Sequence, residues 1–356
     1  MVGVSLDSYV TLGRSGLRVS PFCLGAMTFG EDAGWGASVE VSEEMMSRYI
    51  ELGGNFIDTA NSYTSGHSEV IVGDYLQKRP GLRDRMVIGT KFSSNMFPDD
   101  PNGGGSNRKS IVAAAEESLR RLNFDYIDIY WLHHWDKFTP IEETLRALDD
   151  LITVGKIRYI GVSDTPAWKV AQAQMIAAFR GWAVFIALQI EYSLIERTVE
   201  GELIPAAREL GLGVMPWSPL RNGALAGKYT RANAGVARSD RGEHVTARLT
   251  ERDYDIIDEV IAIAGELDIS PAAVAMAWVR SQPGVVSTVI GARTMEQLEQ
   301  NLESAKVSLS PTQESNLIAV SAPNLVFPHK VLATIQSIHH GNVTAHGPRR
   351  LPAKPY

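Results

Sequence analysis

The stretch at residues 54–63 reads GNFIDTANSY, an apolar run that stops abruptly at polar residues. This pattern predicts a short buried strand over residues 55–60, with Asp58 near its end and Tyr63 in the loop that follows. A carboxylate and a phenol placed this close together at the end of an apolar strand can share one pocket. The stretch therefore predicts both an element of the fold and part of a candidate site.

Two later strands end in the same way. Residues 86–91 form an apolar run that finishes at a lysine, and residues 126–133 form another that finishes at a histidine. In a barrel of parallel strands every carboxyl end opens on the same face, so side chains there converge whatever their separation in sequence. We therefore expect four ionisable side chains to form one constellation: Asp58, Tyr63, Lys91 and His133.

Strands and helices alternate along the rest of the chain. The predicted strands lie at residues 22–27, 55–60, 86–91, 126–133, 159–163, 184–190, 213–217 and 287–290. The predicted helices lie at residues 42–52, 68–77, 108–122, 141–154, 167–179, 203–210, 251–267, 271–281 and 295–304. Strand–helix alternation on this scale argues for a parallel sheet, and helices of this length allow right-handed crossovers. Eight such units favour a closed α/β (β/α)8 TIM barrel over an open sheet.

The two ends of the chain add to this barrel. Apolar residues on both sides of a turn at residues 13–16 predict an N-terminal β-hairpin over residues 9–24, which would cap one end of the core. No change in composition marks a linker, so residues 1–356 are expected to form a single domain. That domain would consist of a barrel core at residues 8–325 and an extended C-terminal tail at residues 326–356.

The composition sets limits on function. Hydrophobic residues make up 44% of the 356 residues and charged residues 21%, which is ordinary for a globular protein. The formal charge of −7 argues against a nucleic-acid surface, which normally carries a basic excess. Cys23 is the only cysteine, so no intrachain disulfide can form, and this fits a reducing compartment. No signal-peptide pattern and no apolar run of roughly 20 residues is found, so a cytoplasmic protein without membrane contact is expected, a homo-oligomer being left open.

Seven stretches, taken in order, resemble those of one enzyme family. They are GNFIDTANSY at 54–63, VIGTK at 87–91, YIDIYWLH at 126–133, GKIRYIGVS at 155–163, LQIEY at 188–192, MPWSPL at 215–220 and IGARTMEQLEQN at 290–301. Together they resemble the aldo-keto reductase superfamily, and within it the bacterial members close to the potassium-channel β-subunit type, over roughly residues 8–325. The resemblance implies an oxidoreductase that reduces carbonyl substrates, aldehydes and ketones, to alcohols with NADPH.

The resemblance also implies that the constellation of Asp58, Tyr63, Lys91 and His133 is a catalytic tetrad. Hydride addition to a carbonyl builds negative charge on oxygen, so a proton donor is needed. A free phenol has a pKa near ~10, which is too high for easy proton transfer both to and from the substrate oxygen. A lysine ammonium beside Tyr63 is expected to lower the pKa of the phenol, while Asp58 keeps Lys91 in place and charged. The imidazole of His133 is expected to donate a hydrogen bond to the carbonyl oxygen.

The cofactor site is implied by the resemblance alone, because no G-x-G-x-x-G follows a strand and no G-x-x-x-x-G-K-[ST] is present. Residues implied at the nicotinamide are Ser163, Asp164, Gln189 and, as the stacking ring, Trp217. Residues implied at the pyrophosphate are Ser218, Leu220, Asn222, Gly223 and Lys228. Residues implied at the adenosine are Gly291, Arg293, Gln297 and Asn301. Met27 and Asp58 are implied as further cofactor contacts.

Three of these positions depart from the family. Asp164 stands where the family usually has Asn, and an ionised carboxylate can accept from a carboxamide nitrogen but cannot donate to its oxygen. Gly291 and Gln297 stand where many relatives carry a lysine and a second arginine. Arg293, near the start of a predicted helix, is still well placed for a 2′-phosphate, so NADP(H) is expected rather than NAD(H).

The sequence also bears on functions other than carbonyl reduction. A metal site at His133 and His134 is not expected, because successive strand side chains point to opposite faces and no further His or Cys lies at ligand spacing. A lyase that uses Lys91 in a Schiff base is disfavoured, because the Asp58 carboxylate favours the ammonium form. The main alternative is a nucleotide-binding regulatory subunit with slow reductase activity, which would retain the same tetrad.

Loop side chains were considered for the rim of the substrate pocket. The candidates are Trp35, Asn95, Phe97, Trp135 and Phe327. An aromatic rim suits apolar or ring-bearing carbonyls. Each of these residues is equally consistent with ordinary surface packing.

Overall fold

The computed structural model of the protein describes residues 4–233, 249–341 and 343. The chain falls into two compact units, residues 1–322 and residues 323–356. All the tetrad and cofactor residues predicted above belong to the first unit. The predicted organisation of residues 1–356 as one domain stays a prediction for the chain as a whole.

Eight parallel strands form the central sheet of the first unit. They are β3 (Phe22–Gly25), β4 (Phe56–Asp58), β5 (Val87–Phe92), β6 (Ile127–Leu132), β7 (Ile157–Ser163), β8 (Phe185–Glu191), β9 (Gly213–Trp217) and β10 (Thr288–Ile290). Neighbours pair in the order β10-β3-β4-β5-β6-β7-β8-β9. The Val214 amide donates to the Gly284 carbonyl (3.0 Å) and the Val286 amide donates to the Val214 carbonyl (2.9 Å), which brings β9 and β10 together. The predicted (β/α)8 barrel is confirmed.

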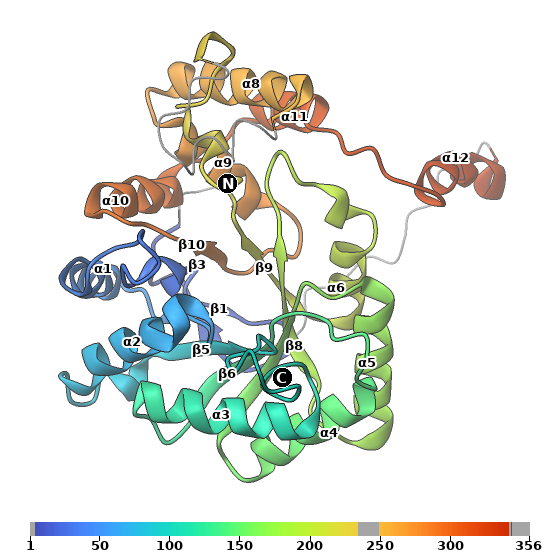
Figure 1. Ribbon diagram of the computed structural model, residues 1–356. Helices are drawn as coiled ribbons and strands as arrows, with labels where there is room; N and C mark the ends of the chain where they lie inside the picture. The colour runs from blue at the N-terminus through green and yellow to red at the C-terminus, as the bar shows by residue number, and fades with distance from the viewer. Residues whose placement is uncertain (1–3, 234–248, 342, 344–356) are drawn as a thin grey trace. The chain divides into compact units, whose positions relative to one another are not determined.

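Helices lie around the outside of the strands (Figure 1). They are α1 (Val39–Glu51), α2 (His67–Gln77), α3 (Arg108–Leu122), α4 (Ile141–Thr153), α5 (Ala167–Arg180), α6 (Leu203–Leu210), α8 (Glu251–Leu267), α9 (Pro271–Ser281), α10 (Met295–Glu303) and α11 (Pro311–Val320). Helix α11 was not predicted, although Ser310 and Gln313 form a capping box around Pro311 at its start. Leu317 is the only buried residue of α11, so the helix lacks the apolar stripe by which helices are found in a sequence.

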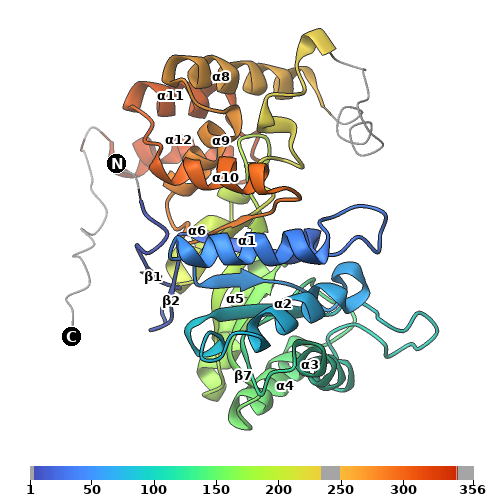
Figure 2. The same cartoon turned by 90° about the vertical axis from the view of Figure 1, so that its left-hand side faces the viewer.

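A short antiparallel hairpin, β1 (Val10–Thr11) with β2 (Arg18–Val19), covers one end of the barrel. Leu12 and Val19 are fully buried and pack with side chains of the barrel interior. Gly13 has a φ of +58°, and a Cβ there would lie 2.1 Å from the carbonyl oxygen of Ile186, so only glycine permits this approach. Figure 2 shows the hairpin at the end opposite to the loops that follow β3 and β5. The predicted hairpin cap is confirmed.

Side chains of each strand alternate between the barrel interior and the surrounding helices. The interior cluster includes Phe56, Val87, Ile129, Trp131 and Met215. Asp58 lies two residues beyond Phe56 on β4, and Lys91 lies four residues beyond Val87 on β5. Both therefore continue inward-facing rows toward the C-terminal end of the barrel, where the sequence placed the candidate site.

The second unit contains helix α12 (His329–His340). The tail at residues 326–356 was expected to be extended, so this helix is a departure from the prediction, while residues 344–356 lie outside the described part. Across the described residues, no single helix is long and apolar enough to cross a membrane. Helices α8 and α9, taken together as a pair bent by 102°, are the one combination in the described part of the chain that passes that test of length and composition.

A buried ion pair ties three elements together on the outside of the barrel. The carboxylate of Glu69 in α2 has no exposed surface, and it accepts from Nε of Arg121 in α3 (2.6 Å) and from the hydroxyl of Thr90 in β5 (2.5 Å). We expect Glu69→Gln to lower the free energy of unfolding by about 3 kcal/mol, because removing one charge of a buried pair leaves the other uncompensated. Urea unfolding measures this change.

Glu117 offers a matched control for this variant. It also pairs with Arg121, at 3.7 Å, but its side chain is 41% exposed. We expect Glu117→Gln to change the free energy of unfolding by no more than about 1 kcal/mol. Equal losses for the two variants would show that burial of the pair does not decide its contribution.

Candidate active site

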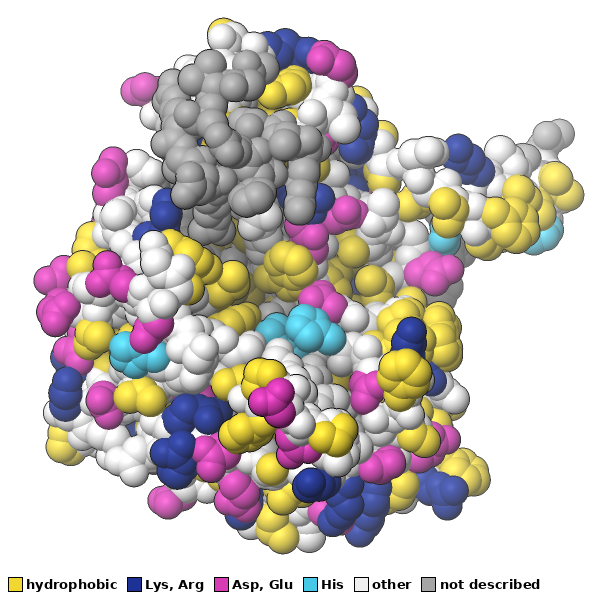
Figure 3. Space-filling model, in the orientation of Figure 1, with side chains coloured by type: hydrophobic (Ala, Val, Ile, Leu, Met, Phe, Trp, Pro, Cys, Tyr) yellow, Lys and Arg dark blue, Asp and Glu magenta, His cyan; other side chains and the backbone are white. Residues whose placement is uncertain are grey.

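A cavity of about 680 Å³ opens at the C-terminal ends of the barrel strands. Figure 3 shows this face, which is hollowed at its centre, with histidine side chains beside the hollow. Asp58, Tyr63 and His133 line the cavity, as does every cofactor contact implied by the sequence. Of the predicted tetrad and cofactor residues, Lys91 alone does not, because it is fully buried beneath the others. The structure thus brings the predicted residues together, while their roles stay predictions.

Lys91 connects the ionisable groups at the base of the cavity. Its ammonium donates hydrogen bonds to Oδ2 of Asp58, to the carbonyl oxygen of Thr59 (2.9 Å) and to the phenol oxygen of Tyr63 (3.1 Å). The side chains of Asp58 and Lys91 are 2% and 1% exposed. Because almost no solvent reaches this pair, its charges act on Tyr63 with little screening.

A strained turn places Tyr63 over Lys91. Thr64 and Ser65 follow it with φ values of +45° and +55°, a left-handed conformation that residues other than glycine rarely adopt. The Thr64 hydroxyl donates to the carbonyl of Phe29 (3.0 Å) and accepts from the amide of Ser68 (3.0 Å). These bonds hold the turn between the loop after β3 and the start of α2.

Burial and neighbouring charges shift the pKa values of Lys91 and Tyr63 in opposite directions at the base of the cavity. Burial alone would lower the pKa of Lys91, but the carboxylate of Asp58 and the oxygen of Tyr63 outweigh it, so the pKa is raised and Lys91 stays an ammonium. For Tyr63 burial is the largest influence, and it raises the pKa of the phenol although Lys91 acts to lower it. The expected fall of the Tyr63 pKa below its usual value is therefore wrong for this cavity. The phenol of Tyr63 therefore keeps its proton at neutral pH.

His133 forms the wall next to Tyr63. The two rings meet edge to face, with centroids 5.9 Å apart and an angle of 80° between their planes. Burial, together with the positive charge of Lys91, lowers the pKa of His133 to about 2. The imidazole is therefore neutral, and one of its two ring nitrogens carries a proton that it can donate.

The orientation of the His134 ring differs from the prediction made from the sequence. The rings of His133 and His134 were expected to diverge, yet they stack with centroids 4.0 Å apart and planes at 16°. Strand β6 ends at Leu132, so the alternation of strand side chains has already stopped at these two residues. Nδ1 of His134 also lies 3.8 Å from Oδ2 of Asp164, on the cavity lining.

Side-chain contacts fix three of the residues implied at the nicotinamide. Nε1 of Trp217 donates to Oδ1 of Asp164 (3.1 Å), and Nε2 of Gln189 donates to Oδ2 of Asp58 (3.2 Å). Burial raises the pKa of Asp164, while the indole of Trp217 acts to lower it. Oδ1 of Asp164 is thus used to hold the Trp217 ring, and Oδ2 faces the rim beside His134.

The loop after β9 lines the middle of the cavity through Ser218, Asn222, Gly223 and Lys228. Ser218, Arg221 and Asn222 have φ values of +51°, +48° and +54°. Hydrogen bonds within the loop hold this turn, because the Arg221 amide donates to the Ser218 carbonyl (2.8 Å) and the Asn222 amide donates to Oγ of Ser218 (3.0 Å). The side chain of Arg221 pairs with Glu191, which fastens the loop to β8. The Lys228 side chain supplies a cation of the kind that suits a pyrophosphate.

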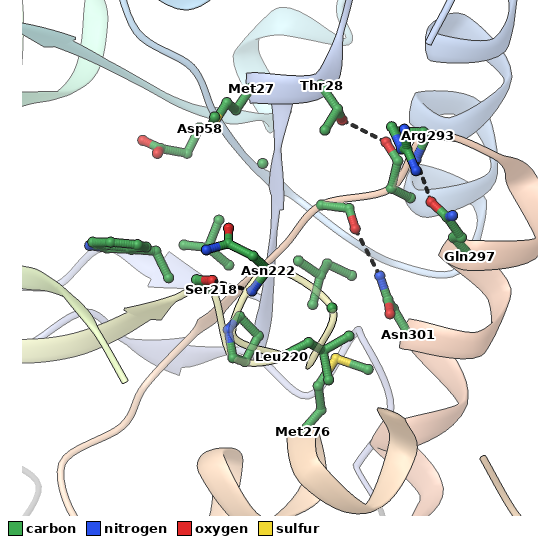
Figure 4. A pocket seen from close by; sticks show the side chains of 18 of the residues that line it. Met27, Thr28, Asp58, Ser218, Leu220, Asn222, Met276, Arg293, Gln297 and Asn301 are labelled. Atoms are coloured by element: carbon green, nitrogen blue, oxygen red, sulfur yellow. Dashed lines mark hydrogen bonds between the residues drawn. The ribbon is translucent and has the colours of Figure 1, made fainter. Parts of the chain in front are cut away.

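The far end of the cavity lies at the start of α10 (Figure 4). The amide of Arg293 donates to Oε1 of Gln297 (2.9 Å), and Nδ2 of Asn301 donates to the Gly291 carbonyl (3.0 Å). Figure 4 shows Asp58 and Arg293 on opposite sides of the cavity. An ionisable cluster lies at one end of the cavity, a lysine lines its middle, and a guanidinium stands near a helix N-terminus at the other end. This arrangement fits a dinucleotide phosphate.

A sequence model described as the Aldo/keto reductase family matches residues 21–321. That span contains all eight barrel strands and every residue that lines the cavity. The chain belongs to the aldo/keto reductase family. It is an oxidoreductase of that family, and the resemblance on which the sequence analysis relied is confirmed.

Relatives of this aldo/keto reductase match it over most of its length. It is 36% identical to the uncharacterized oxidoreductase YrpG of Bacillus subtilis, over 85% of this chain and 92% of that protein. It is 36% identical to the versiconal hemiacetal acetate reductase of Aspergillus parasiticus, over 90% of this chain and 98% of that protein. It is 34% identical to the aryl-alcohol dehydrogenase GME11368 of Pestalotiopsis microspora, over 89% of this chain and 82% of that protein.

Sequence reasoning missed part of the lining in this aldo/keto reductase. The missed residues are Gly25, Thr28, His134, Pro219, Ala226, Tyr229, Ala272, Met276, Val289, Ile290, Ala292 and Gln300. Ala272 and Met276 lie one turn apart on α9, and a helix that walls a cavity reads like ordinary core in a sequence. Thr28 donates through Oγ1 to the carbonyl of Ala292 (2.5 Å), a contact between distant segments that no local pattern reveals.

The loop residues predicted at the rim of the substrate pocket do not line the cavity. Among the residues that the structure describes, Trp35, Asn95, Phe97 and Trp135 stand outside the cavity wall. Trp135 packs edge to face on Trp168, with centroids 5.5 Å apart, and Phe327 belongs to the second unit. Over the described ranges, no group of three or more His, Cys, Asp or Glu is arranged to hold a metal ion.

Proposed function

We propose that this protein reduces aldehydes and ketones to alcohols with NADPH, with Tyr63 as the general acid. One observation carries the proposal. The phenol oxygen of Tyr63 lies 3.1 Å from the ammonium of Lys91, which also donates to the buried carboxylate of Asp58, at the base of a large cavity. Membership of the aldo/keto reductase family supports the same class of reaction.

NADPH, when bound, supplies the hydride. Tyr63 delivers the proton to the substrate oxygen as negative charge develops there. The ammonium of Lys91 stabilises the phenolate that is left behind, and it is charged at every stage because its pKa is raised. Asp58 holds that ammonium in place. Neutral His133 donates its N–H to the same substrate oxygen and stabilises the developing charge.

We infer that aromatic aldehydes are preferred substrates, because one relative is named an aryl-alcohol dehydrogenase. Much of the cavity wall is apolar, including Met27, Trp217 and Met276, which suits a ring-bearing substrate. The test is a panel of aromatic and aliphatic aldehydes, such as a nitrobenzaldehyde and butanal, with NADPH consumption followed by nicotinamide absorbance. Faster consumption with aromatic members is expected. No consumption by folded protein on any member would contradict the proposal, and very slow turnover on all would favour the regulatory subunit.

Arg293 is expected to decide between NADPH and NADH. We expect Arg293→Ala to raise the dissociation constant for NADPH about 10- to 100-fold while leaving that for NADH nearly unchanged, because only NADPH carries the 2′-phosphate that a guanidinium can bind. Fluorescence titration of both cofactors measures this.

Arg48 provides the control for Arg293. It binds Glu299 of α10, the helix that begins just after Arg293, with 2.6 Å between Nε and Oε1, and it does not line the cavity. Arg48→Ala should leave both dissociation constants unchanged. An equal rise of the NADPH and NADH dissociation constants in Arg293→Ala would show that Arg293 does not recognise the 2′-phosphate.

A further inference from the structure

Trp131 fills the barrel interior directly below the ionisable cluster. It lies on β6, pairs in register with Lys91 of β5 on one side and with Gly161 of β7 on the other, and has no exposed surface. A Cβ on Gly161 would lie 2.2 Å from Cε3 of Trp131, so glycine is required there to make room for the indole. Glycine at 161 and tryptophan at 131 thus form one packing unit beneath the site.

The two oxygens of the Asp58 carboxylate differ in their hydrogen bonds. Oδ2 accepts from both Lys91 and Gln189, whereas Oδ1 is buried and has no hydrogen-bond partner among the described residues. Nε1 of Trp131 is also buried and also has no partner within hydrogen-bond geometry. Oδ1 of Asp58 is therefore a buried acceptor and Nε1 of Trp131 a buried donor, and the two lie in the same layer of the barrel.

Gly89 shows that these two atoms border the same small volume. A Cβ on Gly89 would lie 2.6 Å from Oδ1 of Asp58 and 2.8 Å from Nε1 of Trp131. One small volume beside the backbone of β5 therefore borders both atoms, and only a glycine leaves it open. Burial raises the pKa of Asp58, and the indole of Trp131 is among the groups that act to lower it, after Lys91 and Gln189.

We propose that Trp131 is a positioning residue for the reductase reaction, whose indole N–H donates to Oδ1 of Asp58 and holds that carboxylate in the orientation that serves Lys91. The proposal rests on the proposed function for its kinetic consequence, but the contact itself does not. A buried carboxylate oxygen without a donor is costly, and so is a buried indole N–H without an acceptor, so the pair removes both costs at once. Fixing Oδ1 also prevents the carboxylate from rotating away from the ammonium.

The contact is tested by nuclear magnetic resonance of protein carrying nitrogen-15 in its indole rings. Trp278 is the matched control, because it too is fully buried and its Nε1 has no hydrogen-bond partner among the described residues, yet it lies in α9 and does not line the cavity. In Asp58→Asn, we expect the indole proton of Trp131 to shift upfield as its charged acceptor is lost, and that of Trp278 to stay in place. Assignment uses nuclear Overhauser contacts from the Trp131 ring to Gly161. An unmoved Trp131 resonance would overturn the proposal, whether or not the protein reduces any carbonyl.

The consequence for catalysis is tested by Trp131→Phe, which removes the N–H and keeps an aromatic ring. We expect kcat for aldehyde reduction to fall about 10-fold, as for loss of a hydrogen bond to a charged group, with KM for the aldehyde and the NADPH dissociation constant nearly unchanged. Trp278→Phe should lose thermal stability to a similar extent and keep its kcat. Equal kcat values for the two variants would show that Trp131 contributes only to packing. If Trp131→Phe fails to fold, the resonance of the Asp58→Asn protein still decides the matter.

Discussion

Tyr63→Phe is expected to lower kcat for aldehyde reduction by about 10³-fold, while the dissociation constant for NADPH stays nearly unchanged. The phenol oxygen of Tyr63 accepts from the ammonium of Lys91 at 3.1 Å, so its loss removes the proposed proton donor and keeps the ring. NADPH consumption measures the first quantity and fluorescence titration the second. A kcat close to that of the unaltered protein would show that another group delivers the proton.

Tyr130→Phe is the control for this variant. Tyr130 lies on β6 of the same barrel, is fully buried, and packs on the outer side of the strand, where its hydroxyl is 3.4 Å from the Ile111 carbonyl. Removal of this hydroxyl should leave kcat unchanged. A loss of kcat as large as that of Tyr63→Phe would mean that loss of any buried phenol oxygen disturbs the site.

Lys91→Met is expected to damage both activity and stability. Turnover should fall by at least about 10²-fold, because no cation then stabilises the phenolate of Tyr63. The free energy of unfolding should fall by about 3–5 kcal/mol, because Asp58 would be left as a buried charge without its partner. Urea unfolding and NADPH consumption, measured on the same preparation, give the two numbers.

The double variant Asp58→Asn with Lys91→Met separates these two effects. Removing both charges should restore much of the lost stability, because a neutral pair costs less to bury than an unpaired carboxylate. Activity should stay low, since the cation is still missing. Recovery of turnover together with stability would show that the charges support only the fold.

Much of the site was predictable from strand ends. Asp58, Lys91 and His133 lie at or just beyond the ends of apolar strands of a parallel barrel, and the carboxyl ends of such strands open on one face. This is why residues as far apart as Asp58 and His133 could be assigned to one pocket from the strand pattern. Gln189, which forms a 3.2 Å hydrogen bond with Asp58, and the adenosine end around Arg293 were instead implied by the family resemblance.

What the sequence could not supply depends on three-dimensional surroundings. The pKa of Tyr63 is decided by burial against the charge of Lys91, and the balance of the two requires the packed structure. The stacking of His133 on His134 depends on where β6 ends, and a shift of one residue in that boundary changes the direction of both rings. The pairing of Trp131 with Asp58 required the glycine at 89, whose importance no periodic pattern reveals.

The most direct test of the account is to follow the hydride itself. A single turnover of the protein with an aromatic aldehyde and NADPH that carries deuterium at both C4 positions of the nicotinamide should yield an alcohol with one deuterium on the former carbonyl carbon. The same experiment with Tyr63→Phe should yield almost none in the same time. An alcohol without deuterium, or equal yields from the two proteins, would contradict direct hydride transfer with Tyr63 as the proton donor.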